Sequence, residues 1–374
     1  MPTRALMIFA MVAVAMGFAA ISRPSTAALR ASAQPFDSAR YARFAQGDTA
    51  ALRAFAVRFG FAHGDTAVAA LRANGVRAFL RRQGSPAVVF PVVTTTQTFH
   101  NDMNVYGVNG PLDVRPDALT LTFDETITGL MEPSGEVTSA LGHVFVTEET
   151  AADVKVFSYT SSNFMVTNTL MDPGEVPFDV ASSPSEKLVA VSNSMTTSSG
   201  NGSVSVYLGG AKNPTSILTV KAKAIGVGIA LDHKQNCFWS YDTTSSGPGT
   251  IVEFVHCKGA PKTIVSTLTA AGGLAFDRGN NLFYVDQAAG KVFRCNGTIA
   301  CTPLVSAPHL NVPFFIHFDR NWKHLWLTDP GNGSPSETPT IYALNPKTGK
   351  AQSTTPAHGG IPSYGIAPDP GSKF

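Results

Sequence analysis

The sequence predicts an all-β protein folded as a β-propeller, most simply one with six blades. Two observations support this prediction. A pattern of short apolar strands repeats at a period of about 45 residues between residues 137 and 370, which is a period typical of propeller blades. The chain also ends on a strand of the type that opens each repeat, as expected if the last strand pairs with N-terminal strands to close a ring.

The opening strand of each repeat is a short apolar run that ends in Asp. Clear copies are 228–232, 273–277, 315–319 and 365–369, and 179–183 is a weaker copy. An Asp that precedes a turn rich in Gly, Asn or Lys accepts hydrogen bonds from main-chain N–H groups. We therefore expect the terminal aspartates to stabilise turns rather than to bind metal: Asp232, Asp277, Asp319 and Asp369.

Further strands complete each unit. Second strands, which end in a polar residue, are expected at 143–148, 188–193, 237–242, 282–286 and 325–329. Third strands, which alternate apolar and polar residues, are expected at 154–159, 204–208, 251–255, 292–295 and 341–344. Fourth strands are fainter, at 216–220 and 263–268. Aspartates at second-strand ends, Asp242, Asp286 and Asp329, are also expected to form local hydrogen bonds.

Five units can be identified directly, and residues 87–123 supply strands for a sixth at 88–93, 104–108 and 119–123. Rings of five or seven blades remain alternatives. The propeller is thus expected over residues 87–374, with its clear repeats at 137–370.

All four cysteines lie in the propeller, and an even number in an exported chain indicates disulfides with three alternative connectivities. The spacing favours Cys295–Cys301, because an Asn-Gly turn signal lies between them and brings two strand ends face to face. That pairing leaves Cys237 with Cys257 across another hairpin. A metal site is the weaker alternative, because no Cys-x-x-Cys motif or nearby Cys/His cluster is present.

Residues 1–33 have the pattern of a signal peptide. One Arg precedes an uncharged run over 5–21, and small-residue cleavage sites follow at 25–27 and 31–33. The interpretation places the protein in the periplasm or outside the cell. An uncleaved N-terminal membrane anchor and a transit-type presequence are the alternatives.

Residues 36–84 form an Arg-rich segment with helical periodicity. Residues 1–84 carry 11 Arg, 3 Asp and no Lys or Glu, a net charge of +8, whereas residues 137–374 are neutral. The segment would suit contact with an anionic membrane surface, and a helical spacer with solvated Arg side chains is the plainer alternative. Export makes nucleic acid an improbable partner.

The repeats resemble a known group of proteins. Gly-Ile-Ala-x-Asp followed by x-Leu-aromatic-x-x-Asp resembles the NHL repeat, and residues 324–329 are similar to a YWTD-type strand. Both types belong to six-bladed propellers that include TolB-like and gluconolactonase-like proteins. The resemblance specifies the fold better than the activity, because such folds host unrelated functions.

The resemblance also implies where a metal would bind. Gluconolactonase-like propellers hold a divalent cation in the central channel, and an Asn precedes the Gly of their first strands. The corresponding residues here offer no oxygen ligand: Phe178, Val227, Gly272, Phe314 and Tyr364. Because Asp179 alone cannot replace several oxygen ligands, we expect no cofactor, and Ca²⁺ belongs only to a lactonase alternative.

Aromatic residues stand where those ligands would be. If the starts of the first strands ring the channel mouth, Phe178, Phe314, Phe315 and Tyr364 form an apolar concavity with Asp179 and His317 as its polar groups. Ordinary packing between blades is the alternative.

No catalytic motif of the Gly-x-Ser-x-Gly, His-Glu-x-x-His or phosphate-loop type is present. The sequence therefore favours a non-enzymatic, exported, NHL-like propeller that binds a protein, peptide or small molecule on one face of the ring. A metal-dependent lactonase or related hydrolase at the channel mouth is the alternative.

Overall fold

The structure, a computed structural model, describes residues 88–96, 102–109, 120–160, 163–243, 248–305, 307–319, 322–331, 338–357 and 363–368. The expected signal peptide and the Arg-rich segment lie outside these ranges. Within them the regular structure is strand, apart from the short 3-10 turn η3 (Val255–Cys257). None of the helical segments among these residues is long and apolar enough to cross a membrane.

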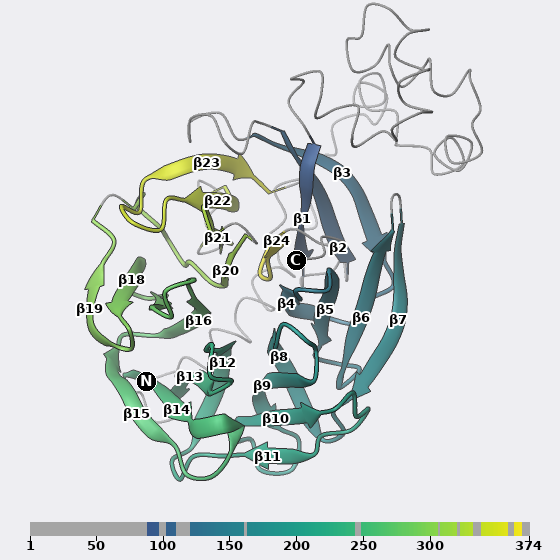
Figure 1. The fold of residues 1–374 in the computed structure, drawn as a ribbon, viewed down its shortest axis with the longest axis vertical. Coiled ribbons are helices and arrows are strands. Elements are labelled where there is room, and N and C mark those ends of the chain that lie inside the picture. Colours follow the sequence, from purple (N-terminus) through teal and green to yellow (C-terminus); the bar gives the residue numbers. More distant parts are fainter. Residues whose placement is uncertain are drawn as a thin grey trace, which may run out of the picture.

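Six antiparallel four-stranded sheets surround a central axis (Figure 1), which confirms the predicted six blades. Blade 1 contains β24 (Ala367–Pro368), β1 (Val88–Thr96), β2 (Asp102–Asn109) and β3 (Thr120–Thr128). Blade 2 contains β4 (Pro133–Thr138), β5 (His143–Glu148), β6 (Asp153–Thr160) and β7 (Asn163–Met171). Blade 3 contains β8 (Glu175–Ser182), β9 (Leu188–Thr196), β10 (Ser203–Leu208) and β11 (Ser216–Leu218).

The other three blades follow in chain order. Blade 4 contains β12 (Ala224–Leu231), β13 (Cys237–Thr243), β14 (Gly249–Phe254) and β15 (Lys262–Leu268). Blade 5 contains β16 (Ala271–Phe276), β17 (Leu282–Asp286), β18 (Lys291–Asn296) and β19 (Ile299–Pro303). Blade 6 contains β20 (Ile316–Phe318), β21 (Leu325–Asp329), β22 (Thr340–Leu344) and β23 (Ala351–Pro356).

The ring closes through the C-terminal strand, as expected. In blade 1, β24 supplies the innermost strand, and Ala367 pairs with Val93 of β1. Just before β24, Tyr364 donates its main-chain N–H to the carbonyl oxygen of Thr95 at 3.0 Å. The N-terminal and C-terminal parts of the propeller therefore share one sheet, which removes two open edges.

Hydroxyl side chains on the second strands connect neighbouring inner strands. Ser240 Oγ accepts a hydrogen bond from the N–H of Gly228 at 2.8 Å and donates to the carbonyl oxygen of Gly272 in the next blade at 2.6 Å. Thr147 likewise bridges the carbonyl oxygens of Gly135 and Phe178. These contacts satisfy main-chain groups that the inner-strand bulges leave without a ladder partner.

The glycine in the Gly-Ile-Ala-x-Asp repeat is explained by close approach of the inner strands. A Cβ at Gly228 would lie 2.6 Å from the carbonyl oxygen of Gly272, and one at Gly273 would lie 2.7 Å from the Cα of Phe315. Neither approach is sterically allowed, because backbone atoms cannot move aside locally. The apolar core lies between the blades, for example around Trp239, which is fully buried and donates to Ser192 Oγ at 2.9 Å.

The predicted turn role of the repeated aspartates is confirmed for three of them. Asp232 Oδ1 accepts from the N–H groups of Lys234 and Asn236, and Asp277 and Asp319 make equivalent bonds in their turns. Asp369 lies outside the described residues. In blades 2 to 6, the turn between the first and second strands has a residue with positive φ at its fourth position. These residues are Gly142, Glu186, Gln235, Asn280 and Trp322.

Both expected disulfides are present. Cys295 bonds Cys301 across the β18–β19 hairpin, and Cys237 bonds Cys257 beside the β13–β14 hairpin. Cys237 and Cys257 are almost completely buried. Two disulfides suggest that the protein folds in an oxidising compartment.

Several strands were not expected from the sequence. The first strand of blade 2, β4, carries a Pro, a Gly and a charged residue, so it lacks the apolar run of the other copies. The outer strands β7, β19 and β23 are largely exposed or polar, which hides the strand periodicity.

Candidate functional site at the channel

The four aromatic residues singled out by the sequence meet at the propeller axis. Phe178 comes from β8 of blade 3, whereas Phe314 and Phe315 directly precede β20 of the opposite blade 6 (Figure 1). The ring centroid of Phe178 lies 5.7 Å from those of both Phe314 and Phe315. Tyr364, before β24, lies 5.3 Å from Phe314 in an edge-to-face arrangement. We call these four residues the axial aromatic cluster.

The axial aromatic cluster is packed on one side and accessible on the other. Phe315 is fully buried among apolar residues of blades 6 and 1, while Phe178, Phe314 and Tyr364 are partly exposed. Contacts of this geometry add about 0.5–1.5 kcal/mol per pair beyond area burial. The cluster therefore both fixes opposite blades to one another and presents aromatic surface at the axis.

Asp179 adjoins this cluster but is used for structure. Its Oδ1 accepts from the N–H of Val180 and its Oδ2 from the N–H of Ile229, each at 2.9 Å. Burial raises the pKa of Asp179 well above its ordinary value, and the two main-chain donors oppose this shift. With both oxygens occupied, the carboxyl group joins the inner strands of blades 3 and 4.

Glu136 is a second buried carboxyl group, which was not predicted from the sequence. Neither Oε has a hydrogen-bond partner among the described residues, and the side chain is completely buried. Burial raises the pKa of Glu136 well above its ordinary value, and the nearby main chain of Thr95 opposes the shift. A Cβ on Gly365 would lie 3.0 Å from Glu136 Cγ, so the side chain faces the inner strand of blade 1.

The signal that could have revealed Glu136 is its place in the repeat. Glu136 pairs with Val146, just as Ile229 pairs with Trp239 and Ile316 pairs with Leu327. The other blades therefore put an apolar residue at this position. A carboxyl group at an apolar position costs free energy unless it is protonated or has a partner.

His317 occupies the inner strand β20 and pairs with Trp326 of β21. It is partly accessible, yet burial of the ring lowers its pKa to about 4. The ring is therefore neutral at neutral pH.

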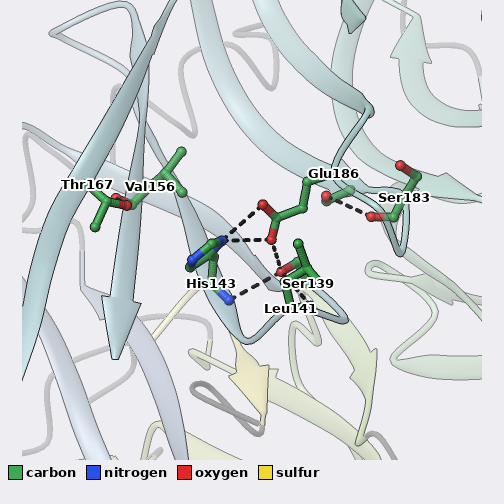
Figure 2. Close-up of polar contacts among 8 residues, drawn as sticks. Ser139, Leu141, His143, Val156, Thr167, Ser183 and Glu186 are labelled. Atoms are coloured by element: carbon green, nitrogen blue, oxygen red, sulfur yellow. Dashed lines mark hydrogen bonds and ion pairs between the residues drawn. The ribbon is translucent and has the colours of Figure 1, made fainter. Parts of the chain in front are cut away.

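A Ser, a His and a Glu meet between blades 2 and 3, but not in a catalytic arrangement (Figure 2). Glu186 accepts hydrogen bonds from Ser139 Oγ and lies 2.9 Å from His143 Nδ1 through both of its oxygens. Ser139 Oγ also accepts from the N–H groups of Leu141 and His143. The serine hydroxyl donates its hydrogen bond to the carboxylate and not to the imidazole. The three residues therefore connect two turns and do not form an activated nucleophile.

A buried polar network lies in blade 3. Asn193 Nδ2 donates to Ser203 and Ser205 at 2.9 Å, and these serines donate to Glu175 and Asp172 at 2.8 and 2.7 Å. Burial raises the pKa of Asp172 to about 7, and the charge of Glu175 adds to the shift while Ser205 opposes it. No group of three or more His, Cys, Asp or Glu in the described part of the chain is arranged to hold a metal ion.

Comparison with known proteins supports the fold alone. No protein-family model matches the sequence, and no curated protein is significantly similar to it. The structure is similar to a chain of a nidogen–laminin complex, with a TM-score of 0.57, 16% identity, and coverage of 75% of this chain and 98% of that chain.

Two further structures are less similar. A candidate 6-phosphogluconolactonase from Bacteroides uniformis has a TM-score of 0.47, 14% identity, and coverage of 72% of this chain and 83% of its own. A luciferin-regenerating enzyme has a TM-score of 0.44, 13% identity, and coverage of 60% and 76%.

Proposed function

We propose that this chain is an exported, NHL-like β-propeller that binds a protein, peptide or small ligand on one face of its ring, at the axial aromatic cluster. The observation that supports the proposal is the exposed surface of Phe178, Phe314 and Tyr364, which three different blades bring together. Partly exposed aromatic side chains on a rigid scaffold are typical anchors of binding surfaces. The two disulfides support export.

The alternative, a metal-dependent lactonase or related hydrolase, finds one supporting observation in Glu136, whose buried oxygens have no hydrogen-bond partner among the described residues. Against it, both oxygens of Asp179 are already bonded to the main chain. A hard cation requires several oxygen ligands at one point, and Glu136 faces blade 1 while Asp179 bonds to blade 4.

The experiment is a selection of phage-displayed random dodecapeptides on the purified protein. Clones that bind wild type are then tested against Phe178→Ser and Phe314→Ser, with Ile299→Ser as a control on the exposed outer strand β19. The proposal expects clones whose binding falls about tenfold or more in the two axial variants and not in the control. Calcium-dependent thermal stabilisation together with lactone turnover that is lost in Asp179→Ala would instead favour the hydrolase.

A further inference from the structure

Three turns at the opposite end of the inner strands form one continuous surface. The axial aromatic cluster lies at the starts of the inner strands, whereas these turns, whose described residues are 232–236, 277–281, 319 and 322–324, follow their ends. The N–H of His233 in blade 4 donates to Asn280 Oδ1 in blade 5 at 2.9 Å. The His233 ring also meets the Trp322 ring of blade 6 edge to face, with centroids 6.3 Å apart.

Trp322 is an unusual residue for its position. Its φ is +59°, in the left-handed region, where the equivalent turns have Gly142, Glu186, Gln235 and Asn280. A bulky aromatic residue is strained there, whereas Gly and Asn are not. Its ring rests on Phe318, with centroids 5.4 Å apart, and stays partly exposed. Turn geometry alone therefore does not account for a tryptophan at this site.

The same surface is positively charged. The side chains of Lys234, Arg278 and Lys323 are exposed on the three turns. Neither Lys234 nor Arg278 makes a salt bridge to an acidic residue that the structure describes.

The acidic residues of these turns form no ion pair with Lys234 or Arg278. Asp232 bonds main-chain N–H groups of its own turn, and Asp277 bonds both the turn and the side chain of Asn281. Asp319 is buried and lies 2.5 Å from His324 Nδ1. Asp277 is partly exposed, but its carboxylate also lies 3.9 Å from Arg294, outside these turns. The surface therefore presents an aromatic ring and cations, and its partly exposed carboxylate is already bonded.

We infer that this surface, formed by His233, Lys234, Arg278, Trp322 and Lys323, binds an acidic peptide segment of a protein partner. An aromatic anchor flanked by cations matches a peptide that places an apolar residue between Asp and Glu residues. The three cations among the described residues of these turns are fewer than the dense basic patch that a nucleic acid or sulfated polysaccharide needs. This site is separate from the axial aromatic cluster and does not depend on its function.

Tryptophan fluorescence provides a direct reading of this site. The protein has three Trp residues, and two of them, Trp239 and Trp326, are buried. Addition of the blocked peptide Asp-Glu-Asp-Phe-Asp-Glu should therefore change the emission of Trp322 and protect it from quenching by acrylamide. The peptide in which Lys replaces every acidic residue serves as the comparison.

Variants measured by calorimetry test the assignment. Trp322→Asn keeps a residue suited to positive φ, and we expect it and Lys234→Glu/Arg278→Glu each to weaken binding of the acidic peptide about tenfold. Trp322→Phe, which keeps an aromatic ring, should retain most of the wild-type affinity. Lys262→Glu, on the exposed part of β15, should change the affinity less than twofold. Melting temperatures and near-ultraviolet circular dichroism establish that each variant is folded.

Any of three results with the peptide and its competitors would overturn the inference. They are no binding of the acidic peptide at millimolar concentration, equal binding of the lysine peptide, and tighter binding of a sulfated oligosaccharide or a DNA duplex than of the acidic peptide. Loss of binding in Phe314→Ser as well would place the peptide at the axial aromatic cluster and would equally contradict it.

Discussion

Asp179 of blade 3 accepts a hydrogen bond from the main-chain N–H of Ile229 in blade 4, with 2.9 Å between Oδ2 and N. The bond joins two inner strands whose bulges leave that N–H without a ladder partner. The other Asp179 oxygen accepts from Val180, so one carboxyl group satisfies two buried donors. An unsatisfied buried donor costs about 1–3 kcal/mol.

Asp179→Asn should therefore destabilise the propeller by about 1–3 kcal/mol, because the amide has one acceptor oxygen for two N–H donors. Urea denaturation of the variant and of wild type measures the difference. Ser194→Ala, which removes only a long bond to the carbonyl oxygen of Val176, is a suitable control. A variant as stable as wild type would show that the Asp179 bonds add nothing to the stability of the ring.

At Glu136, in contrast to Asp179, we expect a substitution to raise the free energy of unfolding. Because the other blades have an apolar residue at this position, Glu136→Leu should stabilise the protein by about 1–4 kcal/mol at neutral pH. Glu136→Gln keeps the size but remains a buried polar group, so it should gain less. Thermal unfolding of both variants tests this. Destabilisation by Glu136→Leu would mean that the carboxyl group has a favourable partner in the folded protein.

The pattern of the second and third strands made the fold predictable, because these strands alternate or are continuously apolar and begin close to their expected residues. The first strand of blade 2 was missed because its core position is Glu136 and its neighbours include Pro133 and Gly135. The outer strand β23 was missed because its sequence is polar and only partly buried.

The contacts at the candidate site could be predicted only in part. The repeat alignment puts four aromatic residues at one level of the ring, and opposite blades bring them into contact: Phe178, Phe314, Phe315 and Tyr364. The surface around Trp322 was not predicted. Its residues belong to three turns, and contacts between turns of different blades leave no periodic signal in the sequence.

Asp172 should make the stability of the propeller depend on pH. Its pKa is about 7 in the folded protein, above the ordinary value, because the group is buried beside Glu175. The folded state then holds a proton that the unfolded state has lost, so the free energy of unfolding falls as the pH rises from about 4 to about 7, by on the order of 4 kcal/mol. Above that pH range, Asp172 is ionised in both states, and the stabilisation by its proton is absent.

Asp172→Asn should remove this part of the pH dependence, leaving the variant more stable than wild type at pH 8 and similar to it at pH 4.5. Ser205→Ala keeps the carboxyl group and removes a bond that lowers its pKa, so the fall should persist and extend to higher pH. Urea midpoints measured from pH 4 to 9 give the comparison. If Asp172→Asn shows the same pH dependence of stability as wild type, the loss of stability between pH 4 and pH 7 arises from other buried acids.

The two disulfides should differ in their resistance to reduction. Cys301 is partly exposed, while both sulfurs of Cys237–Cys257 lie in buried residues, so a mild reductant should open Cys295–Cys301 first. Alkylation followed by peptide mapping identifies which cysteines become free. The chain-entropy model assigns about 2–3 kcal/mol to each bridge, so the singly reduced protein should remain folded. Simultaneous reduction of both bridges would contradict the difference in access.

Closure of the ring through β24 predicts a strong dependence on the C-terminal residues. Deletion of residues 363–374 removes the pairing of Ala367 with Val93 and the bonds from Tyr364 and Gly365 to Thr95. It also removes Ile366, which is buried in the interface between blades 6 and 1, and so exposes the apolar residues around it. We expect a loss of more than about 4 kcal/mol, a large fraction of the stability of an ordinary domain.

Deletion of residues 369–374 alone, which lie beyond β24, is the matched control and should leave the melting temperature within a few degrees of wild type. A synthetic peptide of residues 363–374 should bind the shortened chain and raise its melting temperature, because it can restore the missing inner strand in trans. If the chain without residues 363–374 melts cooperatively at the wild-type temperature, the ring is stable without closure, and the β1–β24 pairing does not hold the blades together.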